Sequence, residues 1–175
     1  MSILKVARMG HPVLRRVARK VDPADIKSPA FQKLVDDMIE TTREYEGIGL
    51  AAPQVHEGVR LAIIGIEEGG ADDRTIRVLP VVNPEITPIG TETAEDWEGC
   101  LSVPGLRGRV TRPSHIQLKG LDRRGNRLEL ELSGYAARVA QHETDHLDGV
   151  LFVDRMKSFE TLTFLEEYSK YWTSD

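Results

Sequence analysis

The chain has 175 residues, of which 40% are hydrophobic and 29% are charged, and its formal net charge is −5 at pH 7. These values predict one globular domain that spans residues 1–175. A net negative charge provides no overall electrostatic attraction to nucleic acid. No apolar run approaches the roughly 20 residues that are needed to cross a membrane. The single cysteine cannot form an internal disulfide, which indicates a reducing compartment and a cytoplasmic protein.

The N-terminal segment is basic, with six Lys or Arg residues before the first acid, Asp22. Transit peptides share this bias, but Gly10-His11-Pro12 would break an amphipathic targeting helix early, so we favour a mature N-terminus. Ser28 and Pro29 then predict the N-cap and the first residue of a helix that ends before Gly47. Its apolar stripe comprises Phe31, Leu34, Val35, Met38 and Ile39.

A segment of small residues, Gly47–Gln54, follows this helix. It lacks the glycine pattern of a phosphate-binding loop or of a dinucleotide fingerprint. A tight connection would be its simplest role, but small residues also let a peptide backbone approach closely. Gln54 offers a neutral amide donor, which suits a developing oxyanion.

Short strands are expected between residue 60 and about residue 132. Apolar runs at 61–66 and 78–82 and strict alternation at 127–132 predict three of them, and residues 122–126 predict a hairpin turn. Residues 67–73 are typical of a polar loop tip.

Cys100 lies within Glu98-Gly99-Cys100-Leu101-Ser102. A free cysteine is usually a small buried hydrophobe. Glycines at positions 99 and 105, with Pro104 between them, instead indicate a tight loop in which a thiolate can bind a metal.

A second helix is predicted from residue 133 or 134 to about residue 149, and it carries the pattern His-Glu-x-x-His. His142 and His146 project from the same face as Val139 and can share one metal ion. Glu143 could form a surface ion pair, but its place beside the first histidine favours a general base that takes a proton from water.

Two imidazoles and one thiolate give three protein ligands, which leaves a coordination position for water and substrate. A structural zinc site would need a fourth protein ligand. The chain has no second cysteine, and His11, His56 and His115 stand in unrelated contexts. A thiolate ligand is compatible with iron(II), zinc, cobalt or nickel and argues against magnesium and calcium.

Residues 150–153 are expected to form a last strand, and a C-terminal helix is expected from about Ser158. The predicted buried stripe of this helix contains Leu162, Leu165, Tyr168 and Trp172. The fold class is therefore α+β, with mainly antiparallel strands around a central helix that bears the motif.

Three blocks together resemble the peptide deformylase family, namely Gly47–Gln54, Glu98–Ser102 and Gln141–Gly149. The similarity extends to the opening His11–Arg15 and to the C-terminal helix, so it spans essentially the whole chain, which is similar to the bacterial type 1 form. It implies a metal-dependent hydrolase that removes the N-formyl group from the N-terminal methionine of newly synthesised proteins and releases formate.

The resemblance also implies roles for ten residues, in three groups. The metal ligands would be Cys100, His142 and His146, with iron(II) as the favoured ion and zinc, nickel or cobalt able to substitute. The catalytic groups would be Glu143 as general base and acid, with Gln54 and the backbone N–H of Leu101 at the oxyanion. The substrate contacts would come from Ile48 and Val139 around the methionine side chain, and from Gly49 and Arg107 along the peptide backbone. For Arg107, a solvated loop arginine is an equally good interpretation.

The implied partners are N-formylmethionyl nascent peptides and, through the C-terminal helix, the ribosome, although nearby acids offset Lys157 and Lys170. No membrane contact or direct reading of nucleic acid is expected. Two other functions compete with deformylation. A zinc endopeptidase shares His-Glu-x-x-His but takes its third ligand from downstream of the helix, and a non-enzymatic binding module would have a closed site with four ligands.

Overall fold

The computed structural model describes residues 2–68 and 75–173, so most of the loop expected at 67–73 lies outside the described residues. The α-helices are α1 (Pro29–Glu44), α2 (Gly134–Leu147), α3 (Phe152–Arg155) and α4 (Leu165–Tyr171), and the 3-10 helices are η1 (Pro12–Arg15), η2 (Ala52–Val55) and η3 (Phe159–Thr161). The strands are β1 (Gly49–Ala51), β2 (Leu61–Glu68), β3 (Thr75–Pro88), β4 (Thr93–Cys100), β5 (Val103–Pro113), β6 (His115–Leu121), β7 (Arg127–Ser133) and β8 (Thr163–Phe164). Within the described ranges, none of the helices combines the length and apolar character that crossing a bilayer would require.

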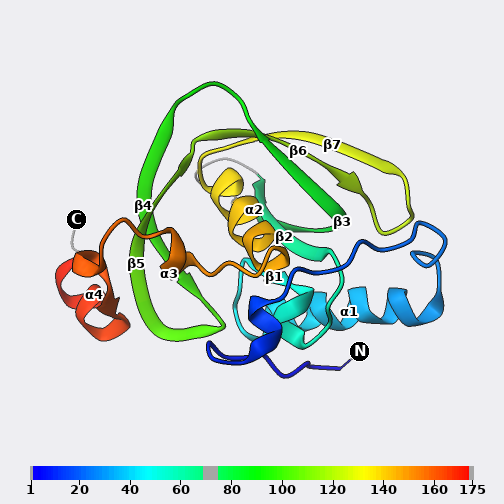
Figure 1. The fold of residues 1–175 in the computed structure, drawn as a ribbon, viewed down its shortest axis with the longest axis horizontal. Helices are drawn as coiled ribbons and strands as arrows, with labels where there is room; N and C mark the ends of the chain where they lie inside the picture. Colours follow the sequence, from blue (N-terminus) through cyan, green and yellow to red (C-terminus); the bar gives the residue numbers. More distant parts are fainter. Residues whose placement is uncertain (1, 69–74, 174–175) are drawn as a thin grey trace.

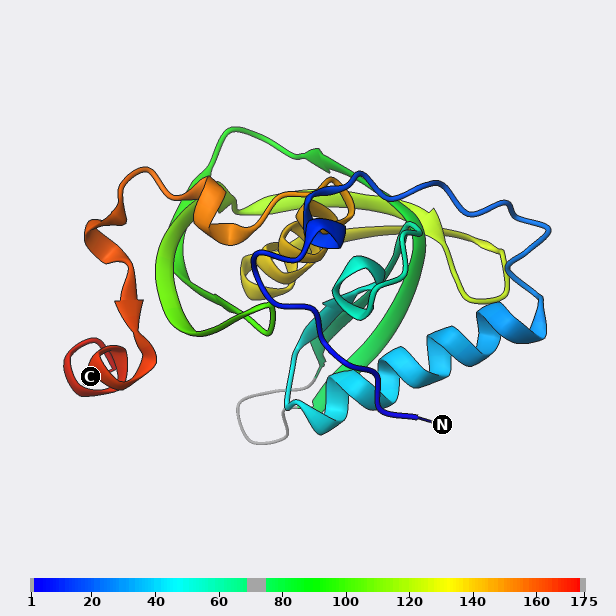
Figure 2. The same cartoon turned by 60° about the horizontal axis from the view of Figure 1, so that its bottom comes forward.

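The strands form two antiparallel sheets, which confirms the α+β class expected from the sequence (Figure 1). The larger sheet has the order β1-β2-β3-β6-β7, and the smaller one has the order β4-β5-β8. The motif-bearing helix α2 lies centrally, between the two sheets in Figure 1, while α1 lies at the opposite end of the molecule from α4 in both ribbon views (Figures 1 and 2).

Strand β2 explains how two helices pack on one sheet. Its fully buried side chains alternate between two hydrophobic clusters, because successive residues of a strand point to opposite faces. Ala62 and Ile64 pack in the cluster that contains the α2 residues, whereas Leu61 and Ile63 pack in the cluster that contains the α1 residues. The large sheet is therefore covered on both faces, with α2 held firmly on one of them.

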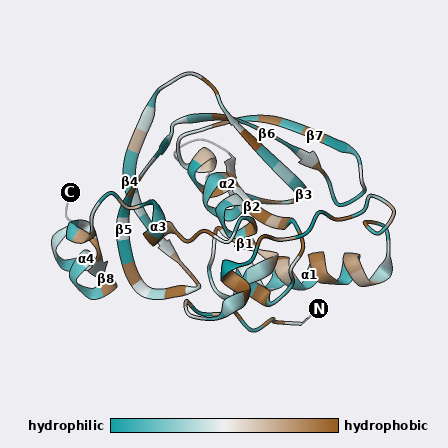
Figure 3. Ribbon diagram, viewed as in Figure 1, coloured by the Kyte–Doolittle hydropathy of each residue, from teal (hydrophilic) through white to brown (hydrophobic). Residues whose placement is uncertain are grey.

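Most predicted elements are present. Ser28 caps α1, with its Oγ accepting from the N–H of Phe31 at 3.3 Å, and the predicted apolar stripe of α1 appears as brown bands on its ribbon (Figure 3). Asp122 closes the predicted hairpin turn, because its Oδ1 accepts from the N–H groups of Arg124 and Asn126, each at 2.8 Å. The three strands expected at 61–66, 78–82 and 127–132 lie in β2, β3 and β7.

The expected strand at 150–153 is wrong, since α3 begins at Phe152. The carboxylate of Asp154 accepts from the N–H of Leu151 at 2.7 Å, and Asp154 N donates back to the Leu151 carbonyl at 2.9 Å. These two hydrogen bonds stabilise a helical turn in a short apolar segment. The hydrophobic pattern of so short a segment does not distinguish a strand from a helix.

The C-terminal helix exists but begins later than expected. Residues after Ser158 first form η3 and then β8, which pairs with β5, and α4 starts only at Leu165. The predicted buried stripe is also wrong, because Leu165 is 39% exposed and Trp172 is 51% exposed. Strand pairing to β5 competes with helix formation here, and it leaves α4 outside the core.

Candidate metal centre

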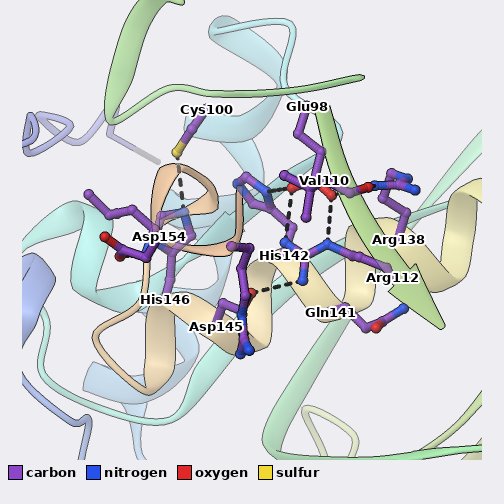
Figure 4. A network of polar contacts seen from close by, with 12 residues as sticks. Glu98, Cys100, Val110, Arg112, Arg138, Gln141, His142, Asp145, His146 and Asp154 are labelled. Atoms are coloured by element: carbon purple, nitrogen blue, oxygen red, sulfur yellow. Dashed lines mark hydrogen bonds and ion pairs between the residues drawn. The ribbon is translucent and has the colours of Figure 1, made fainter. Parts of the chain in front are cut away.

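The three expected metal ligands come from two different parts of the fold. Cys100 ends β4 in the small sheet, while His142 and His146 lie one turn apart on α2. Their ligand atoms all lie within 4.8 Å of one another, and Sγ of Cys100 is 3.2 Å from Nε2 of His146 (Figure 4). The fold thus brings together side chains that are up to 46 positions apart in the sequence.

Glu98 orients one of the histidines. Residues 98 and 100 are two apart on β4, both are buried, and the pairing of β4 with β5 shifts register between them. Oε2 of Glu98 lies 2.9 Å from Nδ1 of His142. A carboxylate at Nδ1 keeps the proton on that nitrogen and leaves Nε2 as the metal-binding atom.

A buried network of ion pairs fixes Glu98 in turn (Figure 4). Arg112 donates to both of its oxygens, at 2.6 and 2.9 Å, and Arg138 donates to Oε1 at 2.7 Å. Arg112 also donates to Asp145 on α2, at 2.8 Å. Burial alone would raise the pKa of Glu98, but the hydrogen bonds from Arg112 and His142 hold that pKa well below its usual range. Glu98 is therefore a fixed anion beside His142.

Glu143 is buried against the first glycine-rich segment. It is 4% exposed, and a Cβ added to Gly49 would lie only 2.7 Å from its carboxyl carbon Cδ. Burial raises the pKa of Glu143 to about 7. Within the described part of the chain, its Oε2 has no hydrogen-bond partner. A buried carboxyl group with an available oxygen suits proton transfer.

Gln54 presents the nitrogen end of its amide to the thiol. Its Oε1 accepts from the N–H of Ala51 at 2.7 Å, which fixes the orientation of the amide. Its Nε2 then lies 3.2 Å from Oγ of Ser102 and 3.6 Å from Sγ of Cys100. An oriented N–H donor therefore stands at the edge of the ligand cluster.

One cleft of about 1330 Å³ is lined by nine of the ten expected site residues. The tenth, His146, is almost fully buried, at 1% exposure. The guanidinium of Arg107 covers Gly99, where an added Cβ would lie 2.7 Å from Nε, and its Nη1 donates to the carbonyl of Leu106 at 3.0 Å. Arg107 is thus part of the cleft wall.

The donor set fits a divalent cation. Burial would raise the pKa of the Cys100 thiol, but the neighbouring imidazoles of His146 and His142 lower that pKa well below its ordinary value. The N–H of Ser102 also lies 3.4 Å from the sulfur, which favours the thiolate. One thiolate and two imidazoles, oriented by a buried carboxylate, match a catalytic site that keeps one coordination position open.

A family model described as polypeptide deformylase matches residues 3–161. The chain belongs to the polypeptide deformylase family. Peptide deformylase from Leptospira biflexa serovar Patoc is 41% identical to it over 170 residues, which cover 95% of each chain. Peptide deformylase 1 from Bordetella pertussis is 43% identical over 167 residues, which cover 92% of each.

Solved deformylase structures have the same fold. The class I type b peptide deformylase from Acinetobacter baumannii, determined with Met-Ala-Ser bound, superposes with a TM-score of 0.82 at 38% identity and covers 89% of this chain and 100% of its own. Peptide deformylase from Thermotoga maritima gives 0.77 at 39% identity, with 90% and 100% covered. The chain is therefore a deformylase of nascent proteins in a metal-dependent family, and these matches do not favour the endopeptidase or the non-enzymatic module.

Sequence reasoning missed the residues that support the three expected metal ligands. Glu98 was named only as the first residue of the segment Glu98–Ser102, without a role of its own. No role was expected for Arg112, Arg138 or Asp145. For Glu98 alone, the signal would have been its spacing of two from Cys100, since residues two apart on a strand tend to share a face. The arginines gave no such signal, since their pairing depends on contacts between β5, β4 and α2.

Proposed function

We propose that Cys100, His142 and His146 hold one divalent cation, and that Glu143 moves the proton during hydrolysis of the N-formyl group. The observation that carries this proposal is the buried carboxyl group of Glu143, which lies in the same cleft as the ligand cluster and against Gly49. When bound, the cation supplies Lewis-acid chemistry, which lowers the pKa of a water molecule and polarises a carbonyl oxygen.

The side chains divide the remaining work. Glu143 accepts the proton of the attacking water and later passes it to the amine nitrogen that leaves. Nε2 of Gln54 and the backbone N–H of Leu101 donate hydrogen bonds to the oxyanion that forms on the formyl group. Gln54 needs no rearrangement for this role, because the bond from Ala51 already fixes its amide.

The substrate is an N-formylmethionyl nascent peptide. Ile48 and Val139 both line the cleft. Val139 belongs to the hydrophobic cluster that contains the α2 residues, and Ile48 packs against that cluster, so the two side chains offer an apolar surface to the methionine side chain. Gly49 and Arg107 contact the peptide backbone. The Acinetobacter deformylase with Met-Ala-Ser bound supports peptides that begin with methionine as ligands of this cleft.

The cation is iron(II), with zinc, nickel or cobalt able to replace it. A thiolate and two imidazoles would accept all four ions, and iron(II) would be the one most exposed to oxidation in a site that is open to the cleft. Contact between the ribosome and the C-terminal helix stays a prediction from the sequence.

Formate release tests the proposed function. Purified enzyme is incubated separately with formyl-Met-Ala-Ser, with acetyl-Met-Ala-Ser and with casein. We expect formate from the first peptide, no acetate from the second and no new casein fragments. Casein cleavage without formate release would instead support a metalloendopeptidase.

A further inference from the structure

A second cavity lies beside the helix that carries the histidine ligands. It has a volume of about 500 Å³, and Arg112 and Arg155 are among the residues that line it. Helix α2 borders both cavities, since Glu143 lines the main cleft and Asp145 lines the second one. Residues two apart on a helix point to roughly opposite sides. The second cavity therefore gives access to α2 from a side that faces away from the cleft.

Two arginines share the carboxylate of Asp145. Its Oδ2 accepts from Nη1 of Arg112 at 2.8 Å and from Nε of Arg155 at 3.1 Å, and its Oδ1 accepts from Nη2 of Arg155 at 2.5 Å. The side chain of Asp145 is 10% exposed, whereas that of Arg155 is 51% exposed. Arg155 thus brings a compensating charge from the surface to a buried carboxylate.

Arg112 is divided between two carboxylates (Figure 4). Its Nε and Nη2 donate to Glu98, while its Nη1 donates to Asp145. A buried carboxylate that loses one of its cationic partners attracts the remaining one more strongly. Without Arg155, Asp145 would therefore draw Arg112 towards itself and away from Glu98.

Glu98 connects these charges to a metal ligand. The same oxygen, Oε2, accepts from Nη2 of Arg112 at 2.9 Å and lies 2.9 Å from Nδ1 of His142. A shift of Arg112 therefore changes the carboxylate that orients the imidazole. Loss of such an outer partner typically lowers metal affinity by about 10- to 100-fold.

We infer that Arg155 is a positioning residue for the metal centre, which acts on His142 through a chain of ion pairs. The chain runs through Asp145, Arg112 and Glu98. The inference rests on the proposed function, in which His142 binds the cation. Arg155 is not among the described residues that line the main cleft, so it influences cation affinity without contact with the substrate.

The test measures the Kd for Ni²⁺ by competition with a chromogenic chelator. Arg155→Met should weaken nickel binding roughly tenfold. Arg155→Lys keeps the charge but not the two-pronged geometry, and it should restore the affinity to within about threefold of wild type. Arg15→Met is the matched control, because the Arg15 side chain is 46% exposed and pairs with Asp154, next to Arg155. Wild-type affinity in Arg155→Met, or an equal loss in Arg15→Met, would overturn the inference.

A double-variant cycle tests whether Arg155 acts through Asp145. In the Asp145→Asn background, Arg155→Met should cause no further loss of nickel affinity, because no carboxylate remains to be compensated. A full tenfold loss in that background would overturn the inference. If Asp145→Asn does not fold, the comparison of Arg155→Lys with Arg155→Met decides alone, and equal affinities for these two variants would overturn it.

Cys100→Ser distinguishes this inference from the proposed function. Weak nickel binding in Cys100→Ser, together with wild-type binding in Arg155→Met, would overturn the role of Arg155 and leave the proposed ligands intact. Wild-type binding in Cys100→Ser would instead overturn the proposed ligands.

Discussion

The carboxyl group of Glu143 lies against the Cα of Gly49, so that a side chain at position 49 and the carboxyl group at position 143 would occupy the same space. An added Cβ would come within 2.8 Å of the Glu143 Cγ and within 2.7 Å of its Cδ. The close approach links the first glycine-rich segment to the helix that carries His-Glu-x-x-His. Glycine at position 49 thus determines where the carboxyl group of Glu143 lies.

Gly49→Ala should lower kcat for formate release by about 100-fold, because displacement of a catalytic group by an ångström has effects of this size. The metal content should stay at the wild-type level, since the three ligands are unchanged. Gly58→Ala is the control, because an added Cβ there meets no atom within 4 Å. Near-normal kcat in Gly49→Ala would mean that Glu143 need not stay where the structure has it.

Glu143→Gln should retain the cation and lose formate release by roughly 10²- to 10⁴-fold, since an amide cannot accept the proton. Metal analysis and steady-state kinetics on the same preparation check both halves of this expectation. Full activity at neutral pH would remove Glu143 from the role of general base. Loss of the metal would instead assign it to the ligand set.

Cys100→Ser should weaken cation binding by more than about 100-fold. Loss of an outer partner of a ligand already costs 10- to 100-fold in affinity, and here the thiolate itself is replaced by a neutral hydroxyl. Competition with a chromogenic chelator measures the change. Ser102→Ala, which keeps the sulfur, is the matched variant, and equal affinities for the two variants would contradict the assignment of Cys100 as a ligand.

The iron(II) form should lose activity in air, because both the metal and the adjacent thiolate can be oxidised. The nickel form, with the same ligands, should keep its activity. The comparison is the half-life of formate release for each form, with and without oxygen. Equal half-lives for the iron form under both conditions would argue against iron as the working ion and would leave the ligands unaffected.

The ion pair between Arg15 and Asp154 should make stability depend on pH at the acidic end. Burial raises the pKa of Asp154, but hydrogen bonds from Arg15 and from the N–H of Leu151 hold it below its ordinary value of 3.8. A lowered folded-state pKa stabilises the fold above about pH 4, and that contribution is lost as the pH falls through the folded-state value.

Asp154→Asn should therefore unfold at lower denaturant concentration than wild type at pH 7, and the gap should narrow below pH 4. Arg15→Gln and the double variant complete the cycle. Because the Asp154 side chain is 38% exposed, the effect should be small. A gap that is constant from pH 3 to pH 7 would show that the charge of Asp154 contributes nothing.

Local patterns were sufficient for α1 and α2, because each has an apolar stripe and a recognisable beginning and end. They also singled out Cys100, His142 and His146, which the fold brings together, because the chain contains few residues that can bind a soft metal. Periodicity failed at residues 150–153, where one carboxylate, that of Asp154, turns a strand-like run into α3. It also failed at α4, since pairing of β8 with β5 is a long-range contact.

The buried charged residues around the site could not be predicted from local sequence patterns, for a related reason. Arg112, Arg138 and Asp145 look like ordinary surface charges in the sequence, yet they are 4%, 6% and 7% exposed in the fold. Charged residues are buried only when they are paired, and the pairs here join β5, α2 and β4. Only the assembled structure specifies those partners.

The sulfur of Cys100 belongs to the small sheet, whereas the imidazoles of His142 and His146 belong to the helix packed on the large one. A cation bound by all three side chains would link the small sheet to the helix α2 and the large sheet. Since the unfolded chain lacks this arrangement, every factor that tightens cation binding also raises the free energy of unfolding. The affinity for the cation therefore depends on how well the two sheets are held together. A substitution far from the cleft that loosens their packing can lower this affinity before any other property changes.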